Sequence, residues 1–278
     1  MRRFETIHKS PYNGLRATMT NKENLQPAID QFLNELKSTC DNLPDMEFSV
    51  EWSNMSTSTL AYTYTYFVPS LGHWKPANRF EVYFNPNAPW SNGTCGEMHP
   101  HHFDLKTAVM HEVLHGMGFL STISANKLSY PTNYDLLLKN SGGSSLVSKN
   151  GQFNGHFGQP VYIENIRMYN PNTFESGSSF SHVHQTSRLM SWAQSACQQH
   201  LDYNTKVIMN QLGYGCLANG SLSRVTSGDS SGMIIGIAIG IVVLVGALVA
   251  AMTCKSKPTK EINKPLLSNK QRQTTIQF

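Results

Sequence analysis

Apolar side chains recur at helical spacing near the start of the chain. Within residues 26–40, four of them stand at positions i, i+3, i+4 and i+7: Ile29, Phe32, Leu33 and Leu36. This spacing places them on one face of a helix, so the segment predicts an amphipathic helix that packs against a core. Residues 202–212 have a similar apolar pattern followed by glycine, which predicts the last helix of the folded domain.

Between these helices, three segments alternate apolar and polar residues and carry many aromatic side chains: residues 46–51, 59–68 and 79–85. Alternation with this composition predicts strands of one sheet. A further helix is expected at residues 104–117 and a short strand within residues 160–168. The order of helix, strands, helix, irregular segment and final helix is typical of an α+β fold.

Residues 233–252 are apolar throughout and carry no charge. Twenty helical residues reach about 30 Å, the thickness of the hydrocarbon core of a bilayer, so this stretch predicts one transmembrane helix; a buried core helix is the alternative. It divides the chain into a folded domain (1–217), a Ser/Gly-rich stalk (218–232), the predicted span and a tail (253–278).

The tail holds six lysine and arginine residues and one glutamate, so its net charge is +5. This exceeds the net charge of +4 of the whole chain. The basic balance therefore gives no reason to expect nucleic-acid binding. It predicts a cytoplasmic tail and a single-pass membrane protein whose catalytic domain is extracellular or luminal. Within and just before the span, Gly232, Gly236 and Gly240 repeat as GxxxG, which is typical of a helix dimer, so a homodimer is one expected assembly.

Cysteines and glycosylation sequons agree with that placement. Four cysteines precede the predicted span and predict two disulfides, with three pairings open: Cys40, Cys95, Cys197 and Cys216. Cys254 follows the span and is a lipidation candidate, with a free thiol as the alternative. Three sequons predict glycosylation: Asn54, Asn92 and Asn219. The N-terminal residues contain no apolar h-region, so no signal peptide is visible. We expect a truncated or misassigned start, and a cytosolic catalytic domain is the alternative.

His111, Glu112 and His115 form an HExxH motif within the helix expected at residues 104–117. Two histidines four positions apart lie about 40° apart around a helix axis, so both can bind one Zn²⁺ through ring nitrogens. Glu112 then lies beside the metal, where it can accept a proton from bound water. The alternative is an amphipathic helix with two surface histidines. The apolar residues around the motif argue against it, because buried polar groups need a partner.

A catalytic zinc needs a third protein ligand. In the shortest pattern of this kind, HExxHxxGxxH, the third histidine would stand at Ser121, which is a poor zinc ligand. The ligand is therefore expected further along the chain, where His182 and His184 lie in a serine-rich segment that is followed by Leu189 and Met190. Three more histidines precede the helix and predict a solvated loop, with a secondary metal role as the alternative: His99, His101 and His102.

The motifs HEVLHGMGF, SFSH and LM together resemble leishmanolysin and related peptidases of the metzincin type. In that family a long insertion precedes the SH segment, which supplies the third histidine, and LM belongs to the Met-turn. The resemblance implies His111, His115 and His182 as metal ligands, in preference to His184, with Met190 packed beneath the site. It also implies a metzincin-like catalytic domain made of a sheet, an active-site helix and an irregular lower subdomain.

These features predict a membrane-anchored, zinc-dependent endopeptidase with one catalytic Zn²⁺. Glu112 is expected to assist the attack of zinc-bound water on a peptide bond. The strand at residues 79–85, taken as a sheet edge, is expected to bind an extended substrate. The partners are thus protein or peptide substrates and, through the predicted span, a lipid bilayer. The alternatives are a non-catalytic adhesion or receptor ectodomain with a structural zinc, and a zinc hydrolase of a non-peptide substrate.

Overall fold

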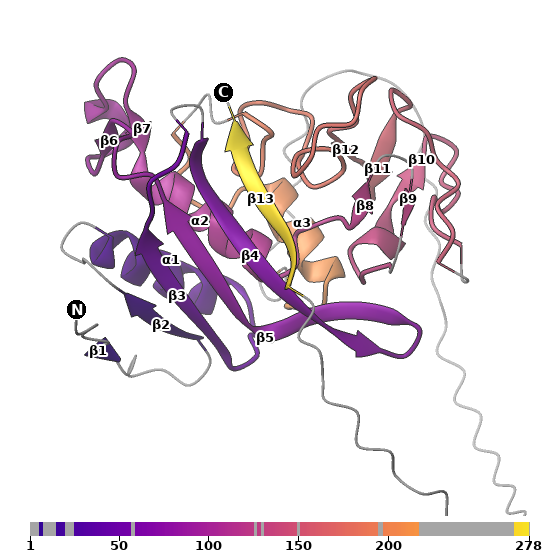
Figure 1. Cartoon of the computed structure of the whole chain (residues 1–278), viewed down its shortest axis with the longest axis horizontal. Helices are drawn as coiled ribbons and strands as arrows, with labels where there is room; N and C mark the ends of the chain where they lie inside the picture. Colours follow the sequence, from indigo (N-terminus) through magenta and orange to yellow (C-terminus); the bar gives the residue numbers. More distant parts are fainter. Residues whose placement is uncertain are drawn as a thin grey trace, which may run out of the picture. The chain divides into compact units, whose positions relative to one another are not determined.

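A six-stranded mixed sheet forms one layer of the structure, which is a computed structural model (Figure 1). The strands follow the order β1-β2-β3-β5-β4-β13. Their bounds are Thr6–Ile7 (β1), Leu15–Met19 (β2), Met46–Trp52 (β3), Thr59–Ser70 (β4), His73–Phe84 (β5) and Lys270–Gln277 (β13). Strands β2, β3 and β5 are parallel to one another, whereas β1, β4 and β13 are antiparallel to their neighbours.

The described part of the chain comprises residues 6–7, 15–19, 25–56, 59–124, 127–128, 131–148, 151–193, 197–216 and 270–277. The predicted stalk, the predicted span, Asn219 and Cys254 lie outside these residues. The homodimer and lipid contacts expected from the span therefore rest on residues that the structure does not describe.

The predicted transmembrane helix has no counterpart in the described part of the chain. No helix among the described residues is both long and apolar enough to cross a membrane. The longest of them, α1, has 14 residues and so reaches only about 21 Å, short of the roughly 30 Å of a bilayer core. Part of the predicted cytoplasmic tail pairs instead with β4 as strand β13. The fold class becomes α+β with mixed sheets, and the placement as a single-pass membrane protein is withdrawn.

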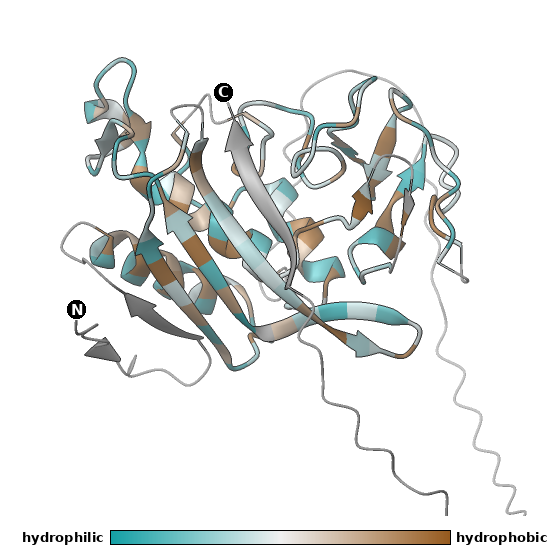
Figure 2. Cartoon of the chain, in the orientation of Figure 1, coloured by the Kyte–Doolittle hydropathy of each residue, from teal (hydrophilic) through white to brown (hydrophobic). Residues whose placement is uncertain are grey.

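Three predicted strands are confirmed as β3, β4 and β5. Alternate residues of β3 are buried, and Figure 2 shows apolar and polar positions alternating along β3 and β5. Strand β5 begins at His73, earlier than predicted, because it continues a long hairpin with β4 whose turn includes Gly72 at φ 85°. Strand β5 lies between β3 and β4, so residues 79–85 are not at an edge of the sheet. The prediction that they bind an extended substrate as an edge strand is therefore wrong.

Two helices pack side by side, and the second lies against β4 and β5: α1, Gln26–Thr39, and α2, Leu105–Gly116 (Figure 1). The predicted apolar face of α1 is buried in the core: Ile29, Phe32, Leu33 and Leu36. Gly116 at the end of α2 lies directly on the Phe80 ring of β5, and a Cβ at that position would overlap the ring. Glycine here allows α2 to approach the sheet closely.

The remaining elements are short. Those before α2 are β6 (Trp90–Ser91), the 3₁₀ helix η1 (Cys95–Glu97) and β7 (Phe103–Asp104). Those after α2 are β8 (Ile123–Ser124), β9 (Lys127–Leu128), the 3₁₀ helix η2 (Asp135–Leu137), β10 (Lys139–Asn140), β11 (Val161–Ile163), β12 (Ile166–Met168) and α3 (Tyr203–Gln211). The predicted final helix is confirmed as α3, and the irregular segment between α2 and α3 carries the loops that complete the candidate site.

Two disulfides join distant parts of the fold, as the cysteine count predicts. Cys40, at the end of α1, pairs with Cys216, which follows α3. Cys95 in η1 pairs with Cys197, which follows the Leu189-Met190 segment. The structure thus selects one of the three pairings that the sequence leaves open, and both bonds tie the chain before α2 to the chain after it.

Candidate metal centre

Helix α2 brings His111, Glu112 and His115 into the core. It begins where predicted, at the N-cap Asp104, whose carboxylate accepts from the Thr107 N–H at 2.7 Å. Nearly the whole helix is buried, because β4, β5 and α1 pack against it and the segment at Leu189 contacts His111. The polar side chains of the motif are therefore held away from water and need partners within the fold.

Three histidines meet at one point. The Nε2 atom of His111 lies 3.0 Å from that of His115 and 3.1 Å from that of His182, and the third pair is 3.2 Å apart. All three side chains are buried, and among the described residues they form a group that could hold a metal ion. The 67 positions between His115 and His182 show why no local pattern reveals the third member.

The opposite ring nitrogens fix the state of each imidazole. His111 Nδ1 donates to the Leu189 carbonyl at 2.8 Å, and His115 Nδ1 donates to the Phe119 carbonyl at 2.6 Å. His182 Nδ1 donates to the Ser178 carbonyl at 3.0 Å. Since a carbonyl oxygen can only accept, each proton lies on Nδ1 and each Nε2 presents a lone pair. Three converging lone pairs cannot bond one another, so this arrangement calls for a cation.

The donor set fits a divalent transition metal. Three imidazole nitrogens around a tetrahedral Zn²⁺, each about 2.0–2.1 Å from the ion, lie about 3.3 Å apart. The observed Nε2 separations of 3.0–3.2 Å are close to that spacing. Three protein nitrogens also leave a fourth position open, which distinguishes catalytic zinc sites from structural ones.

Burial keeps the imidazoles neutral, as metal ligands must be. It lowers the pKa of His111 to about 4, against a smaller opposing effect of the bond to Leu189. It lowers the pKa of His182 to about 3, with a further contribution from the charge of His111. Burial, followed by the charges of the two other histidines, holds the pKa of His115 well below its usual value. Protons therefore compete weakly for these nitrogens near neutral pH.

Glu112 is fully buried between α2 and β4. Its Oε2 accepts from the Thr63 hydroxyl at 2.6 Å, and the same hydroxyl lies 2.9 Å from the Glu112 carbonyl. No described residue hydrogen-bonds its other oxygen, Oε1. Burial raises the pKa of Glu112 to about 8, and the bond from Thr63 opposes that rise. A carboxyl group with one oxygen held and one oxygen free is suited to moving a proton.

The Leu189-Met190 segment supports the site through backbone hydrogen bonds. The Leu189 carbonyl accepts from His111, and its N–H donates to Asp202 Oδ2 at 2.8 Å. Met190 is fully buried, and its carbonyl accepts from the Val183 N–H, next to His182. The segment therefore contacts His111 directly and also holds the residue that follows His182.

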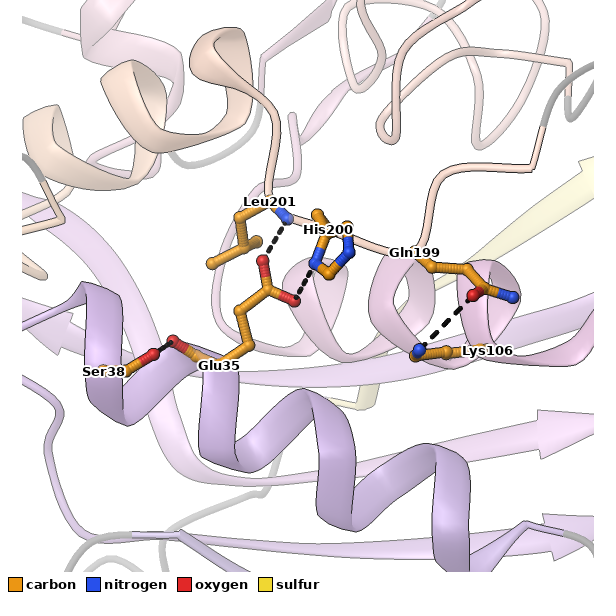
Figure 3. Close-up of polar contacts among 6 residues, drawn as sticks. All are labelled: Glu35, Ser38, Lys106, Gln199, His200 and Leu201. Atoms are coloured by element: carbon orange, nitrogen blue, oxygen red, sulfur yellow. Dashed lines mark hydrogen bonds and ion pairs between the residues drawn. The ribbon is translucent and has the colours of Figure 1, made fainter. Parts of the chain in front are cut away.

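The chain before α3 is fastened to the two large helices (Figure 3). Glu35 in α1 accepts from the Leu201 N–H at 2.6 Å and lies 3.4 Å from His200 Nδ1. Lys106 at the start of α2 donates to Gln199 Oε1 at 3.4 Å. Because Asp202 follows this segment, these contacts hold in place the acceptor for Leu189.

Other residues singled out in the sequence lie apart from the site. His184 is exposed and is not in the histidine group, and His99 and His101 are exposed in the loop before α2. Ser121, at the place of a third histidine in the short pattern, donates to Asp135 at 2.6 Å. Asn54 and Asn92 are exposed, so their glycosylation stays a prediction.

Three site residues escape prediction from the sequence: Thr63, Tyr134 and Asp135. Thr63 stands 49 positions before Glu112, and Tyr134 stands 46 positions before the residue that it contacts, Phe180. A threonine in an alternating strand and a Tyr-Asp pair in a short apolar run are common, and their roles depend on tertiary contacts. The sequence contains one signal for Thr63: its place in the alternation of the strand predicts that its side chain faces the core.

The metal-free protein is expected to be most stable at about pH 6.5. His111 and His182 titrate near 6.5 when unfolded but at about 4 and about 3 in the fold, so the unfolded state binds more protons and stability falls as the pH drops below 6.5. Glu112 moves from 4.5 to about 8, so the fold retains a proton that the unfolded chain releases, and this contribution falls as the pH rises from 4.5 to 8.

Below pH 6.5 the histidines change the free energy of unfolding more than the single carboxyl of Glu112 does, so stability rises with pH. Above pH 6.5 only the Glu112 carboxyl contributes, so stability falls with pH. Urea unfolding of chelator-treated protein between pH 4 and pH 9 measures the curve. Glu112→Gln should remove the decline between pH 6.5 and 8. Stability that rises steadily through that interval in the unsubstituted protein would contradict the prediction.

Comparison with known proteins adds no further support. No family model, curated protein or solved structure matches this chain. The argument for function therefore rests on the geometry of the site.

Proposed function

We propose that this protein is a zinc-dependent endopeptidase. The observation that carries the proposal is a group of three converging imidazole Nε2 atoms, two of them from α2, together with the buried Glu112 of that helix. One oxygen of Glu112 has no hydrogen-bond partner among the described residues. Imidazole suits zinc, and a three-histidine set with an open position is typical of zinc hydrolases. A structural site does not require the carboxylate of Glu112.

In the proposed reaction His111, His115 and His182 hold the ion through Nε2. When bound, zinc supplies Lewis acidity, which makes water more acidic and polarises a carbonyl group. Glu112 accepts a proton from the attacking water at Oε1 and delivers it to the nitrogen of the departing amine. Thr63 holds Oε2 by a hydrogen bond, which leaves Oε1 available to accept that proton. Hydrogen bonds from the Nδ1 atoms to three backbone carbonyls fix the orientation of the three rings: those of Leu189, Phe119 and Ser178.

We propose peptides as the substrates because the residues of the site belong to motifs that resemble those of leishmanolysin, a peptidase. The element order supports the same proposal: a sheet, a buried HExxH helix, an irregular segment with the third histidine, and a Leu-Met turn that contacts His111. The metzincin assignment remains part of the proposal.

The proposal is tested by incubating the purified full chain with casein and with a peptide library, followed by mass spectrometry. We expect new peptide termini, their loss after treatment with a zinc chelator, and their return when zinc is restored. Cleavage that survives complete removal of metal would contradict the proposal. Zinc binding without cleavage of any peptide would favour the non-catalytic alternative, and hydrolysis of small esters alone would favour a non-peptide substrate.

A further inference from the structure

The loop that carries His182 contains a residue in an unfavourable backbone conformation. Phe180 has φ 65°, which lies in the left-handed region that a bulky residue rarely adopts. Its N–H donates to the Tyr169 carbonyl at 2.7 Å, and its side chain is fully buried. Such a conformation persists only where surrounding contacts enforce it, so the groups that hold Phe180 also set the direction in which His182 enters the site.

Tyr134 is one of those groups. Its side chain is fully buried just before η2, and its hydroxyl donates to the Phe180 carbonyl at 2.9 Å. The contact fixes the peptide plane that leads into Ser181 and then His182. Burial raises the pKa of Tyr134 well above its usual value, so the hydroxyl remains a donor at any working pH.

Asp135, the next residue, acts on the same loop through a second route. Its buried carboxylate accepts from Ser121 Oγ at 2.6 Å, from Thr122 Oγ1 at 2.7 Å and from the Thr132 N–H at 2.9 Å. These bonds fix the chain that leaves the end of α2. The Ser121 N–H then donates to the Ser181 hydroxyl at 3.1 Å.

We propose that Tyr134 and Asp135 form a positioning pair for the third metal ligand, His182. Two adjacent residues reach the two residues before His182 by separate bonds, Tyr134 directly and Asp135 through Ser121. In this arrangement Ser121, which stands where the short metal pattern has its third histidine, holds the loop that supplies the ligand from elsewhere. The inference rests on the part of the proposed function in which His182 binds zinc.

The pair is expected to matter for zinc affinity through His182 and not only for folding. Partners that orient a metal-binding histidine typically contribute a factor of about 10–100 to metal affinity. Removing the Tyr134 hydroxyl leaves the ring in place but frees the Phe180 carbonyl. We therefore expect Tyr134→Phe to weaken zinc binding about tenfold, with the folded state retained.

The test is a double-mutant cycle on the full chain, read as the zinc dissociation constant from competition with chelators of graded affinity. The four proteins are the unsubstituted chain, Tyr134→Phe, His182→Ala and the double variant. We expect the roughly tenfold effect of Tyr134→Phe to fall below about twofold once His182 is absent. Tyr214→Phe is the matched control, because this buried tyrosine also donates to a backbone carbonyl, that of Met117, and its effect should not depend on His182.

The outcomes separate the two claims. An effect of Tyr134→Phe that is absent, or equally large without His182, would overturn the positioning role. Unchanged zinc binding in His182→Ala would overturn the ligand set and with it the proposed function. If Tyr134→Phe does not fold, Ser181→Ala replaces it in the cycle, because it removes only the acceptor for the Ser121 N–H, and the same coupling to His182 is expected.

Discussion

Replacing Glu112 with glutamine should reduce kcat/KM for peptide cleavage by about 10²–10⁴-fold while zinc stays bound, since this is the usual contribution of a general base. Glutamine keeps the shape of the side chain and can still accept from Thr63, so the packing between α2 and β4 is preserved. It cannot accept the proton of water at the position of Oε1. The measurements are kcat/KM on a peptide found in the cleavage screen and the zinc content of the same preparation.

The matched control is Glu97→Gln, which makes the same chemical change at an exposed glutamate that caps η1. Its activity should remain within about twofold of the unsubstituted protein, since surface changes rarely alter a distant site. If Glu112→Gln retains bound zinc and more than about a third of the activity, the general base lies elsewhere and the proposed role of Glu112 fails.

Removing the Cys40–Cys216 disulfide should lower the free energy of unfolding by about 5 kcal/mol, a large part of the stability of an ordinary domain. The two cysteines are 176 positions apart, so the bond restricts nearly the whole domain when it is unfolded. Both side chains are buried, which makes alanine a suitable replacement at each. Urea unfolding of the Cys40→Ala/Cys216→Ala protein, compared with the unsubstituted protein under non-reducing conditions, measures the loss.

The second disulfide provides a comparison within the same chain. Cys95 and Cys197 are 102 positions apart, so the same entropic argument gives a loss of about 4.7 kcal/mol for their removal. The two double variants should therefore lose similar stability. A loss below about 1 kcal/mol for Cys40→Ala/Cys216→Ala would contradict the argument that this bond stabilises the fold by restricting the unfolded chain.

The elements with strong periodicity could be predicted because local pattern and tertiary burial agree. The apolar face of α1, the alternation of β3 and the capped start of α2 all follow from residue spacing. The hairpin of β4 and β5 is longer than predicted because its pairing continues past the alternating core positions to the turn at Gly72. The apolar stretch at residues 233–252 predicts a membrane helix, but these residues lie outside the described part of the chain, in which no helix is long and apolar enough to cross a membrane.

The candidate site divides in the same way. His111, Glu112 and His115 lie on one helix, so their spacing is enough to group them. His182 could be proposed only by resemblance, since 67 positions separate it from His115. The groups that orient these side chains are backbone carbonyls and Thr63, and no sequence pattern marks them because any residue supplies a carbonyl.

The central claim is that His111, His115 and His182 hold one catalytic zinc ion. The most direct test is a crystal structure of the zinc-loaded protein, with anomalous diffraction recorded on both sides of the zinc absorption edge. The account predicts a single strong anomalous peak in contact with the Nε2 atoms of these three histidines, with Glu112 beside it but not bound. A peak bound instead by His184 or by the histidines of the loop before α2 (His99, His101 and His102), with none at the buried group, would contradict it.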